Sequence, residues 1–372
     1  MAEQQNLKWP SKSIVDTAID SLKVSPTFEN PGLLPVNEKN GLSTGSTILN
    51  VHLTDDPRYG LAKGTFHHFV GASGSGKTFL TLTCFAEASI SKTFNDYRLI
   101  FDNAENGALM DFDRFFGTKA AHRIEEVNSD RVEEFYDRCY KLMDRGDRFV
   151  MVVDSHDALS SSEEMALMSK HRKARAEGKT ESGSYGDGKA KKNSVNLRGL
   201  VRDIRKSGSI VIMISQERDN IGFDAMFNPN TVSGGRALKF YSHTQIWMRN
   251  KGKIKKTVRG KARTLGQNTG VKITKNRFTG IESDTCLIPI LWSMGIDDAG
   301  GIFDYLLAEK VFSGSGKSFR LSDKQRDIQF SGSRDKAIKL IENHPEEFRD
   351  LVGETYRAVK RDCVVDRVRR YV

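Results

Sequence analysis

The residues with the clearest chemical signature are the eight of GASGSGKT, at positions 71 to 78. Glycines let a backbone wrap so that its N–H groups and the start of the next helix face phosphate oxygens. The lysine of such a segment reaches the β- and γ-phosphates, and the hydroxyl after it binds Mg²⁺. The segment therefore predicts a site for ATP and Mg²⁺ made by Gly71, Ala72, Ser73, Gly74, Ser75, Gly76, Lys77 and Thr78.

A second segment, GSGKS at 314 to 318, has a similar composition. The position that should hold the first glycine is Val311, and no buried strand precedes the segment. We therefore expect a plain loop there and no second phosphate site.

An acid that could complete the nucleotide site is Asp154, which follows the apolar run from 149 to 153. A carboxylate at the end of such a strand can hold Mg²⁺, through water, opposite the phosphate loop. Thr78 and Asp154 are thus the predicted metal ligands. His156 and Asp157, close behind, are expected only to shape the end of the strand.

Hydrolysis also needs a group that orients or deprotonates the attacking water. Glu105 follows the apolar strand from 99 to 101, and its neighbour Asp102 is the competing candidate. Gln216 ends the apolar strand that begins at 210, where a neutral amide could sense a γ-phosphate without adding negative charge. The alternative interpretation of Gln216 is a plain surface glutamine.

Short apolar strands alternating with amphipathic helices must position these groups. Such alternation is typical of an α/β fold with a mostly parallel sheet covered on both faces. After about residue 236 the strands alternate apolar with polar residues, which predicts added antiparallel pairing. The predicted strands are 65–70, 98–101, 149–153 and 209–214, and the predicted helices between them are 78–91 and 132–145.

Three parts follow along the chain. Residues 1–40 contain four prolines and one short amphipathic stretch, and we interpret them as an arm that docks on a neighbouring protomer. Residues 41–296 form the core. Residues 297–372 form a small α+β lobe with a helix, a Gly/Ser loop and helices at 334–343 and 346–370. The Lys-, Gly- and Ser-rich stretch 174–193 is expected to be a mobile loop.

Composition narrows the class of protein. The 372 residues carry 58 Lys plus Arg against 48 Asp plus Glu, a net charge of +10, which favours polyanionic partners. No apolar run approaches the roughly 18 to 20 residues that span a bilayer, and no signal-peptide core is visible, so we expect no membrane partner and a cytoplasmic location. Four separate cysteines without a CxxC pair indicate neither a zinc site nor a disulfide framework.

The positive charge is concentrated in one window. Residues 249 to 277 hold eleven basic residues and no acid, so the rest of the chain sums to 10 minus 11, or −1. The window is either a solvated basic hairpin or a surface that gathers duplex DNA. The second interpretation predicts strongly salt-dependent binding.

Seven segments, spread over residues 40 to 345, resemble the motifs of RecA-type recombinases, including the phage UvsX-like members. They occur in the same order as in that family. They are LSTGS at 42–46, GASGSGKT at 71–78, IFDNAENGAL at 100–109, VMVVDS at 150–155, ISQERDNIGF at 214–223, NPNTVSGGRALKFY at 228–241 and VKITKNR at 271–277. The resemblance implies a RecA-like P-loop ATPase core with a short N-terminal arm and a small C-terminal lobe. Departures are the DNAE spacing at Glu105 and Arg277 in place of the usual lysine.

The resemblance also implies roles at the nucleotide. Glu105 would activate water, Phe112 would stack on adenine, and Gln216 would couple the γ-phosphate to the DNA-binding loop. Lys275 and Arg277 would reach the ATP of the neighbouring protomer, with Lys239 and Phe240 at the same boundary, so hydrolysis would need a filament.

The resemblance further implies contacts with DNA. Residues 217–232 would form one DNA-binding loop, with apolar side chains that insert between bases; the alternative is that these side chains pack onto the core. The segment 170–193 would be a long basic first DNA-binding loop. The implied contact residues are Lys191, Ser194, Arg198, Arg218, Ile221, Phe223, Met226, Phe227, Gly234, Gly235 and Arg249.

The expected function is that of an ATP-dependent homologous recombinase, which forms helical filaments on single-stranded DNA and exchanges strands with a homologous duplex. Single-strand-binding or mediator proteins are further implied partners, and the location would be the nucleoid, or the host cytoplasm for a phage-encoded protein. Two alternatives stay open. One is a ring-forming DNA helicase motor, and the other is an accessory paralogue that binds ATP and DNA without exchanging strands.

Overall fold

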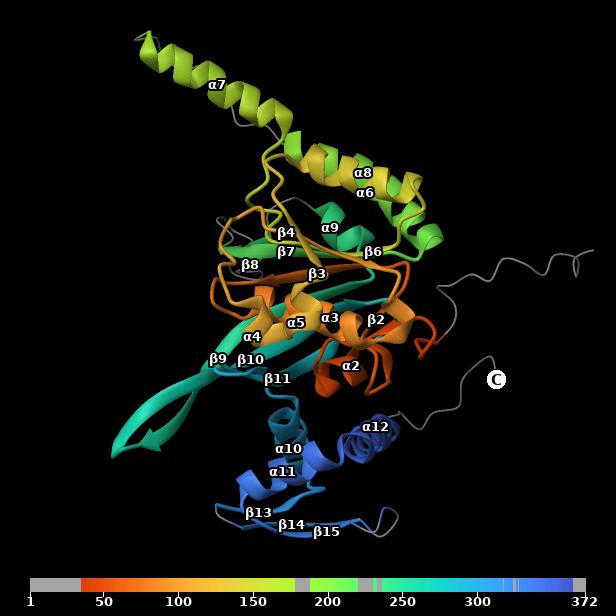
Figure 1. The fold of residues 1–372 in the computed structure, drawn as a ribbon, viewed down its shortest axis with the longest axis vertical. Helices are drawn as coiled ribbons and strands as arrows, with labels where there is room; N and C mark the ends of the chain where they lie inside the picture. The colour runs from red at the N-terminus through yellow and green to blue at the C-terminus, as the bar shows by residue number, and fades with distance from the viewer. Residues whose placement is uncertain are drawn as a thin grey trace, which may run out of the picture. The chain divides into compact units, whose positions relative to one another are not determined.

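A ten-stranded sheet is the central element of the computed structural model, which describes residues 35–177, 188–219, 230–232, 236–316, 318–323, 326 and 328–363 (Figure 1). The predicted arm at 1–34 and the end of the chain lie outside these residues. The strand order is β12 (Gly295–Ile296), β11 (Ser283–Leu291), β10 (Lys261–Asn276), β9 (Thr244–Val258), β3 (Phe66–Gly71), β7 (Ile210–Asp219), β6 (Phe149–Val153), β4 (Arg98–Asp102) and β5 (Ile124–Val127), with β8 (Asn230–Val232) paired to β7.

The larger part of this sheet is parallel, and the smaller part is antiparallel. The pairs from β9 through β3, β7, β6 and β4 to β5 are all parallel. β10, β11 and β12 add antiparallel pairs after residue 236. The predicted α/β class with a mostly parallel sheet is therefore confirmed, as is the change to antiparallel pairing.

Both faces of the parallel half are buried, which explains why its strands are apolar without alternation. Successive side chains of β7 point to opposite faces, so that Ile212 belongs to one apolar cluster and Met213 to the other. Helix α3 (Lys77–Ile90) covers the first face, and α6 (Val132–Asp144) and α8 (Gly188–Ser207) cover the second (Figure 1).

Short elements complete the described core. β1 (Gly41–Leu42) pairs with β2 (Leu61–Ala62). Among the described helices, none has the length and apolar character that a membrane span requires. The other elements of this part are α2 (Thr47–Thr54), a 3₁₀ turn (Lys92–Phe94), α4 (Phe112–Phe116), α5 (Thr118–Ala121), α7 (Ser162–Ala176) and α9 (Arg236–Tyr241).

The C-terminal lobe packs four phenylalanines around one small sheet. It consists of α10 (Asp298–Ala308), the antiparallel strands β13 (Ser313–Ser315), β14 (Ser318–Asp323) and β15 (Ile328–Gly332), then α11 (Arg334–Asn343) and α12 (Pro345–Asp362). The aromatic contacts join Phe303, Phe312, Phe319 and Phe348. Because Asp298 accepts hydrogen bonds from Thr47 N and Oγ1, each at 2.7 Å, the lobe is tied to α2. The domain boundary at 297 stays a prediction.

Three local predictions were wrong. The stretch 174–193 is not one loop, because its first residues end α7 and its last ones begin α8; Lys, Ala and Arg are strong helix formers, and a Ser161–Glu164 capping box starts α7. The Gly/Ser segment after 312 is a β-hairpin of β13 and β14. Helix α12 ends at Asp362 with Cys363 as its C-cap, not at 370.

Candidate nucleotide and DNA site

The phosphate loop lies between the end of β3 and the start of α3, as the sequence predicts. Gly76 has φ of 92°, and a Cβ there would lie 2.6 Å from Ile290 Cδ1. A Cβ on Gly71 would lie 2.2 Å from the carbonyl oxygen of Met248 on the neighbouring strand β9. Only glycine therefore fits these two positions, and the backbone N–H groups at the start of α3 are free to face an anion.

Lys77 is held inside this loop. Its Nζ donates to Gly71 O at 2.8 Å and to Ala72 O at 2.9 Å. Burial lowers the pKa of Lys77, and the carboxylates of Asp154 and Glu105 oppose that shift. A phosphate would supply the negative charge that best compensates a buried ammonium.

A cavity of about 370 Å³ opens over the loop. It brings together residues from the ends of β3, β6 and β7, from the segment after β4 and from β10 and β11. Its lining consists of Ser73, Gly74, Gly76, Lys77, Thr78, Phe79, Glu105, Met110, Asp154, Ser155, Gln216, Gln267, Ile290 and Trp292. Most of the nucleotide residues predicted from the sequence thus meet at one place.

Two observations fit a bound nucleotide with Mg²⁺. Ser75 Oγ is buried in the loop and has no hydrogen-bond partner among the described residues. Thr78 Oγ1 donates to Asp154 Oδ2, and burial raises the pKa of Asp154 while this hydrogen bond lowers it. The described residues include no group of three or more His, Cys, Asp or Glu that could hold a metal. In phosphate sites Mg²⁺ usually takes most of its ligands from phosphates and water.

Of the two candidates for the water-activating acid, Glu105 faces the cavity and Asp102 does not. Glu105 Oε1 accepts hydrogen bonds from Ser155 Oγ and, at 2.8 Å, from Gln216 Nε2. Asp102 is fully buried in β4 and accepts from Ser129 N at 2.9 Å and Ser129 Oγ at 2.7 Å. Burial raises the pKa of Asp102. The geometry assigns Asp102 to the loop after β5 and favours Glu105 for chemistry.

Strand β7 connects this acid to the predicted DNA side. Gln216 N donates to Asp157 Oδ2 at 2.8 Å, and Arg218 Nη2 donates to Asp157 Oδ1 at 3.4 Å. Asp157 was expected only to shape the end of its strand. In the structure its carboxylate also accepts hydrogen bonds from both the backbone of Gln216 and the guanidinium of Arg218. One residue separates Gln216 from Arg218, so a shift of the strand at the nucleotide reaches a DNA-contact candidate directly.

The remaining DNA-contact candidates divide between α8, β9 and segments outside the described residues. Arg249 on β9 donates from Nη2 to Glu217 Oε1 at 2.6 Å, which places it beside β7. On α8, Arg198 Nε donates to Tyr241 Oη at 3.3 Å, and Ser194 lies one turn earlier. The side chain of Lys191 and all of Ile221, Phe223, Met226, Phe227, Gly234 and Gly235 lie outside the described residues.

Lys275 and Arg277 lie away from the cavity of their own chain, at the end of α9. Lys275 Nζ donates to Lys239 O at 2.5 Å and Phe240 O at 2.6 Å, and Arg277 Nη2 donates to Phe240 O at 2.8 Å. Partial burial, with the cations of Arg277 and Lys239 nearby, lowers the pKa of Lys275 to about 8. Two clustered cations at the end of β10, beside the end of α9, are suited to bind an anion from outside the chain.

Phe112, the residue predicted to stack on adenine, is not among the residues that line the cavity. Phe112 begins α4 and packs edge-on against Phe101, with ring centroids 6.1 Å apart. The cavity is instead lined by Met110 and by Trp292, whose residue surface is 53% exposed. The stacking role of Phe112 stays a prediction, and Trp292 is a second candidate for contact with the base.

Sequence reasoning missed two polar residues of β10 that support the loop. Gln267 Nε2 donates to Gly74 O at 2.9 Å, and Thr269 Oγ1 donates to Ser75 O at 3.0 Å. Both residues are buried. The signal that could have found them is a run of polar residues, GQNTG, between apolar residues of a predicted strand.

Comparison with known proteins agrees with this geometry. The family model of the RecA N-terminal domain matches residues 32–297. Protein RecA of Bdellovibrio bacteriovorus is 30% identical over 85% of this chain and 76% of its own length. Protein RecA of Gluconobacter oxydans is 30% identical over 90% and 87%, and that of Thioalkalivibrio sulfidiphilus 29% over 87% and 85%. Because the family model matches more than half of the chain and relatives at 30% identity cover most of it, the chain belongs to the RecA family of recombinases.

Proposed function

We propose that the protein polymerises on single-stranded DNA as a helical filament, pairs it with a homologous duplex and exchanges the strands, with ATP as the switch. The observation that carries the proposal is the hydrogen-bonded chain from Glu105 through Gln216 and Asp157 to Arg218. It joins the nucleotide cavity to the start of the predicted DNA-binding loop over a single strand.

Membership of the RecA family carries a general activity with it. RecA proteins are DNA-dependent ATPases that act in recombination and repair, and this chain shares that function. The family also implies ATP binding, DNA binding and oligomeric filaments. The finer points, which are Mg²⁺, the residues that touch DNA, mediator or single-strand-binding partners, and a nucleoid or host-cytoplasm location, belong to the proposal.

Within the proposed mechanism, the chain's own groups divide the work. The N–H groups of the loop and Lys77 bind the phosphates. Thr78 and Asp154 would hold Mg²⁺, which would supply positive charge beside the phosphates. Glu105 takes the proton of the attacking water, and Ser155 fixes the orientation of its carboxylate. The side-chain amide of Gln216 donates a hydrogen bond to Glu105. When ATP binds, this amide would donate to the γ-phosphate instead and would draw β7 with it.

Lys275 and Arg277 would complete the site of the neighbouring protomer, and this gives a pH dependence. Because the pKa of Lys275 is about 8, we expect kcat/KM of DNA-dependent ATP hydrolysis to fall above about pH 8 as the ammonium deprotonates. Lys275→Arg keeps a cation there and should move the alkaline limb upward. The measurement is a pH profile of both proteins on single-stranded DNA, with Lys272→Arg on the same strand as the matched control.

The titration of Lys275 should affect stability in the opposite direction to activity. The folded-state pKa of Lys275, about 8, lies below the ordinary lysine pKa of 10.5, so the unfolded chain binds more protons between these two pH values. The contribution of Lys275 to the free energy of unfolding therefore rises with pH in this window, while the activity falls. An identical alkaline limb in wild type and Lys275→Arg would contradict the role at the boundary.

The direct test is a joint-molecule assay with homologous and heterologous duplexes, with and without ATP, together with negative-stain images on single-stranded DNA. We expect joint molecules only with homology and ATP, and extended helical filaments. Closed rings that unwind duplexes would identify the helicase alternative. Filaments without joint molecules would identify the accessory alternative, and either result would overturn the proposal.

A further inference from the structure

The outer halves of β9 and β10 form a two-stranded ribbon, residues 251–265, which we call the basic arm. From Lys255 to Thr264 the two strands pair only with each other among the described residues. Nearly all side chains of the arm are exposed, and Figure 1 shows it running past the rest of the sheet. The arm has no packing role in the described core, so its composition is not set by burial.

The arm carries positive charge without internal compensation. It has seven cations, at 251, 253, 255, 256, 259, 261 and 263, and no acid. No salt bridge to any of them is found within the part of the chain that the structure describes. Lys256 lies directly opposite Arg263 in the register. Like charges in directly opposite positions destabilise a strand pair, and an anionic partner would relieve this repulsion.

The turn at the tip places another cation where folding favours a different residue. Arg259 has φ of 52° and Gly260 has φ of 74°. Two positive φ angles in a two-residue loop make a type I′ turn, which favours Asn, Asp or Gly at the first position. Arginine is strained in this conformation, so the tip exposes a guanidinium at some cost to the hairpin.

The root of the arm is fixed to the nucleotide site. Gln267 Oε1 accepts from Asn250 Nδ2 at 2.9 Å and from Lys253 Nζ at 3.3 Å, while its Nε2 donates to Gly74 O. Lys253 Nζ also lies 5.6 Å from the ring centroid of Trp292. The arm is therefore a continuation of the main sheet with a set direction.

The chemistry of the arm favours duplex over single-stranded DNA. Because side chains alternate along a strand, the register places Lys255 on one face and Lys256, Lys261 and Arg263 on the other, so both faces carry cations. A two-stranded ribbon fits the major groove, which has phosphates on both sides. Eight residues from 251 to 258 at about 3.3 Å each give a reach of about 26 Å. The arm has no aromatic residue that could stack on unpaired bases.

We propose that the basic arm binds duplex DNA through its phosphates, with the ribbon in the major groove, and so delivers the duplex to the filament. This inference rests on the proposed recombinase function and assigns its duplex-capture surface. The arm supplies affinity that depends on salt and not on sequence, because its lysines and arginines contact phosphates.

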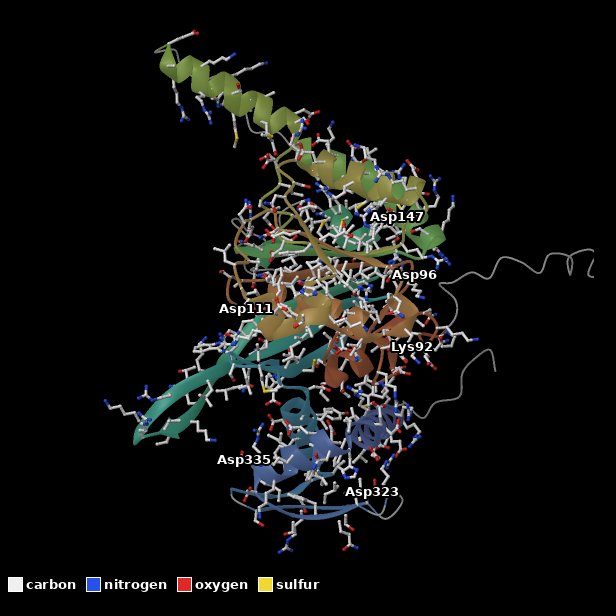
Figure 2. All side chains as sticks on the ribbon, viewed as in Figure 1. Lys92, Asp96, Asp111, Asp147, Asp323 and Asp335 are labelled. Atoms are coloured by element: carbon white, nitrogen blue, oxygen red, sulfur yellow. The ribbon has the colours of Figure 1, made fainter. Side chains whose placement is uncertain are left out.

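The test compares two fourfold variants of the full chain that change the net charge equally. The arm variant is Lys255→Gln, Lys256→Gln, Lys261→Gln and Arg263→Gln. The control removes four exposed cations from other elements, Lys92→Gln (labelled in Figure 2), Lys119→Gln, Lys141→Gln and Arg145→Gln. Fluorescence anisotropy of a labelled duplex oligonucleotide is followed over a series of NaCl concentrations, with preformed filaments on unlabelled single-stranded DNA.

We expect the arm variant to bind the duplex at least roughly tenfold more weakly at low salt, with the slope of log K against log salt reduced by about three to four, or about 0.9 for each lost phosphate contact. The control variant should keep the wild-type duplex affinity and the wild-type salt slope. ATP hydrolysis stimulated by single-stranded DNA should stay unchanged in the arm variant, which also shows that it is folded.

Each other outcome is decisive. Equal duplex affinity and slope in the arm variant and the control would overturn the proposal, and so would an equal loss of single-strand affinity, since the arm would then serve the single strand. If the wild type neither hydrolyses ATP on single-stranded DNA nor forms joint molecules, the proposed function fails independently of the arm.

Discussion

Lys77→Ala is expected to reduce DNA-dependent ATP hydrolysis by roughly 10²- to 10³-fold, the range for removing one donor that stabilises developing charge, and to abolish joint-molecule formation. The ammonium is buried in the loop, where it donates hydrogen bonds to the carbonyl oxygens of Gly71 and Ala72. Alanine removes the charge that would compensate the phosphates. Steady-state hydrolysis and a joint-molecule assay measure the two effects.

Lys92→Ala provides the matched control, because Lys92 lies on the exposed 3₁₀ turn that follows α3. It should leave hydrolysis and strand exchange at the wild-type level. A thermal melt of Lys77→Ala separates loss of function from unfolding. If Lys77→Ala formed joint molecules at the normal rate, ATP would not be the switch of this protein.

Much of the fold was predictable because the information is local. The runs 99–101 and 149–153 are apolar without alternation, which is typical of a strand buried on both faces, and they lie in β4 and β6. The order of the strands in the sheet, by contrast, could not be predicted from local sequence. Nothing in the sequence indicates that β3 lies between β7 and β9, since parallel neighbours can be far apart along the chain.

The residues of the site likewise divide into those that local sequence predicts and those that only the fold brings together. The phosphate loop, Asp154 and Gln216 were found because each directly follows an apolar strand in the sequence. Gln267 reaches the loop only through the register that carries β10 beside β9, so its role appears first in three dimensions. Phe112 was placed by resemblance, and the local packing of α4 against Phe101 gives it a different immediate neighbour.

The stretch 174–193 shows a limit of composition. Lysine, glycine and serine suggested a loop, yet Lys and Arg are also good helix formers, and the capping box that starts α7 lies at 161–164, before the stretch begins. Judging a biased segment by its own composition, without the helix start upstream, led to the wrong prediction.

Glu105→Gln is expected to lower ATP turnover by roughly 10²- to 10⁴-fold, the usual contribution of a general base, while nucleotide affinity stays within a few-fold. Glutamine keeps an oxygen that can accept from Ser155 Oγ, so the loop geometry is preserved and only proton transfer is lost. The protein should therefore still assemble on single-stranded DNA with ATP, in filaments that persist longer than those of the wild type. Single-turnover hydrolysis and filament lifetime are the measurements.

Asp102→Asn separates the two acids that the sequence left in competition. Its carboxylate accepts two hydrogen bonds from Ser129, and the amide keeps only one of the two acceptor oxygens, so the buried Ser129 hydroxyl loses the acceptor of its own hydrogen. We expect a loss of about 1–3 kcal/mol in the free energy of unfolding, the cost of an unsatisfied buried group, with near-normal turnover of the folded protein. The opposite pattern, normal turnover in Glu105→Gln and lost turnover in stable Asp102→Asn, would make Asp102 the catalytic acid.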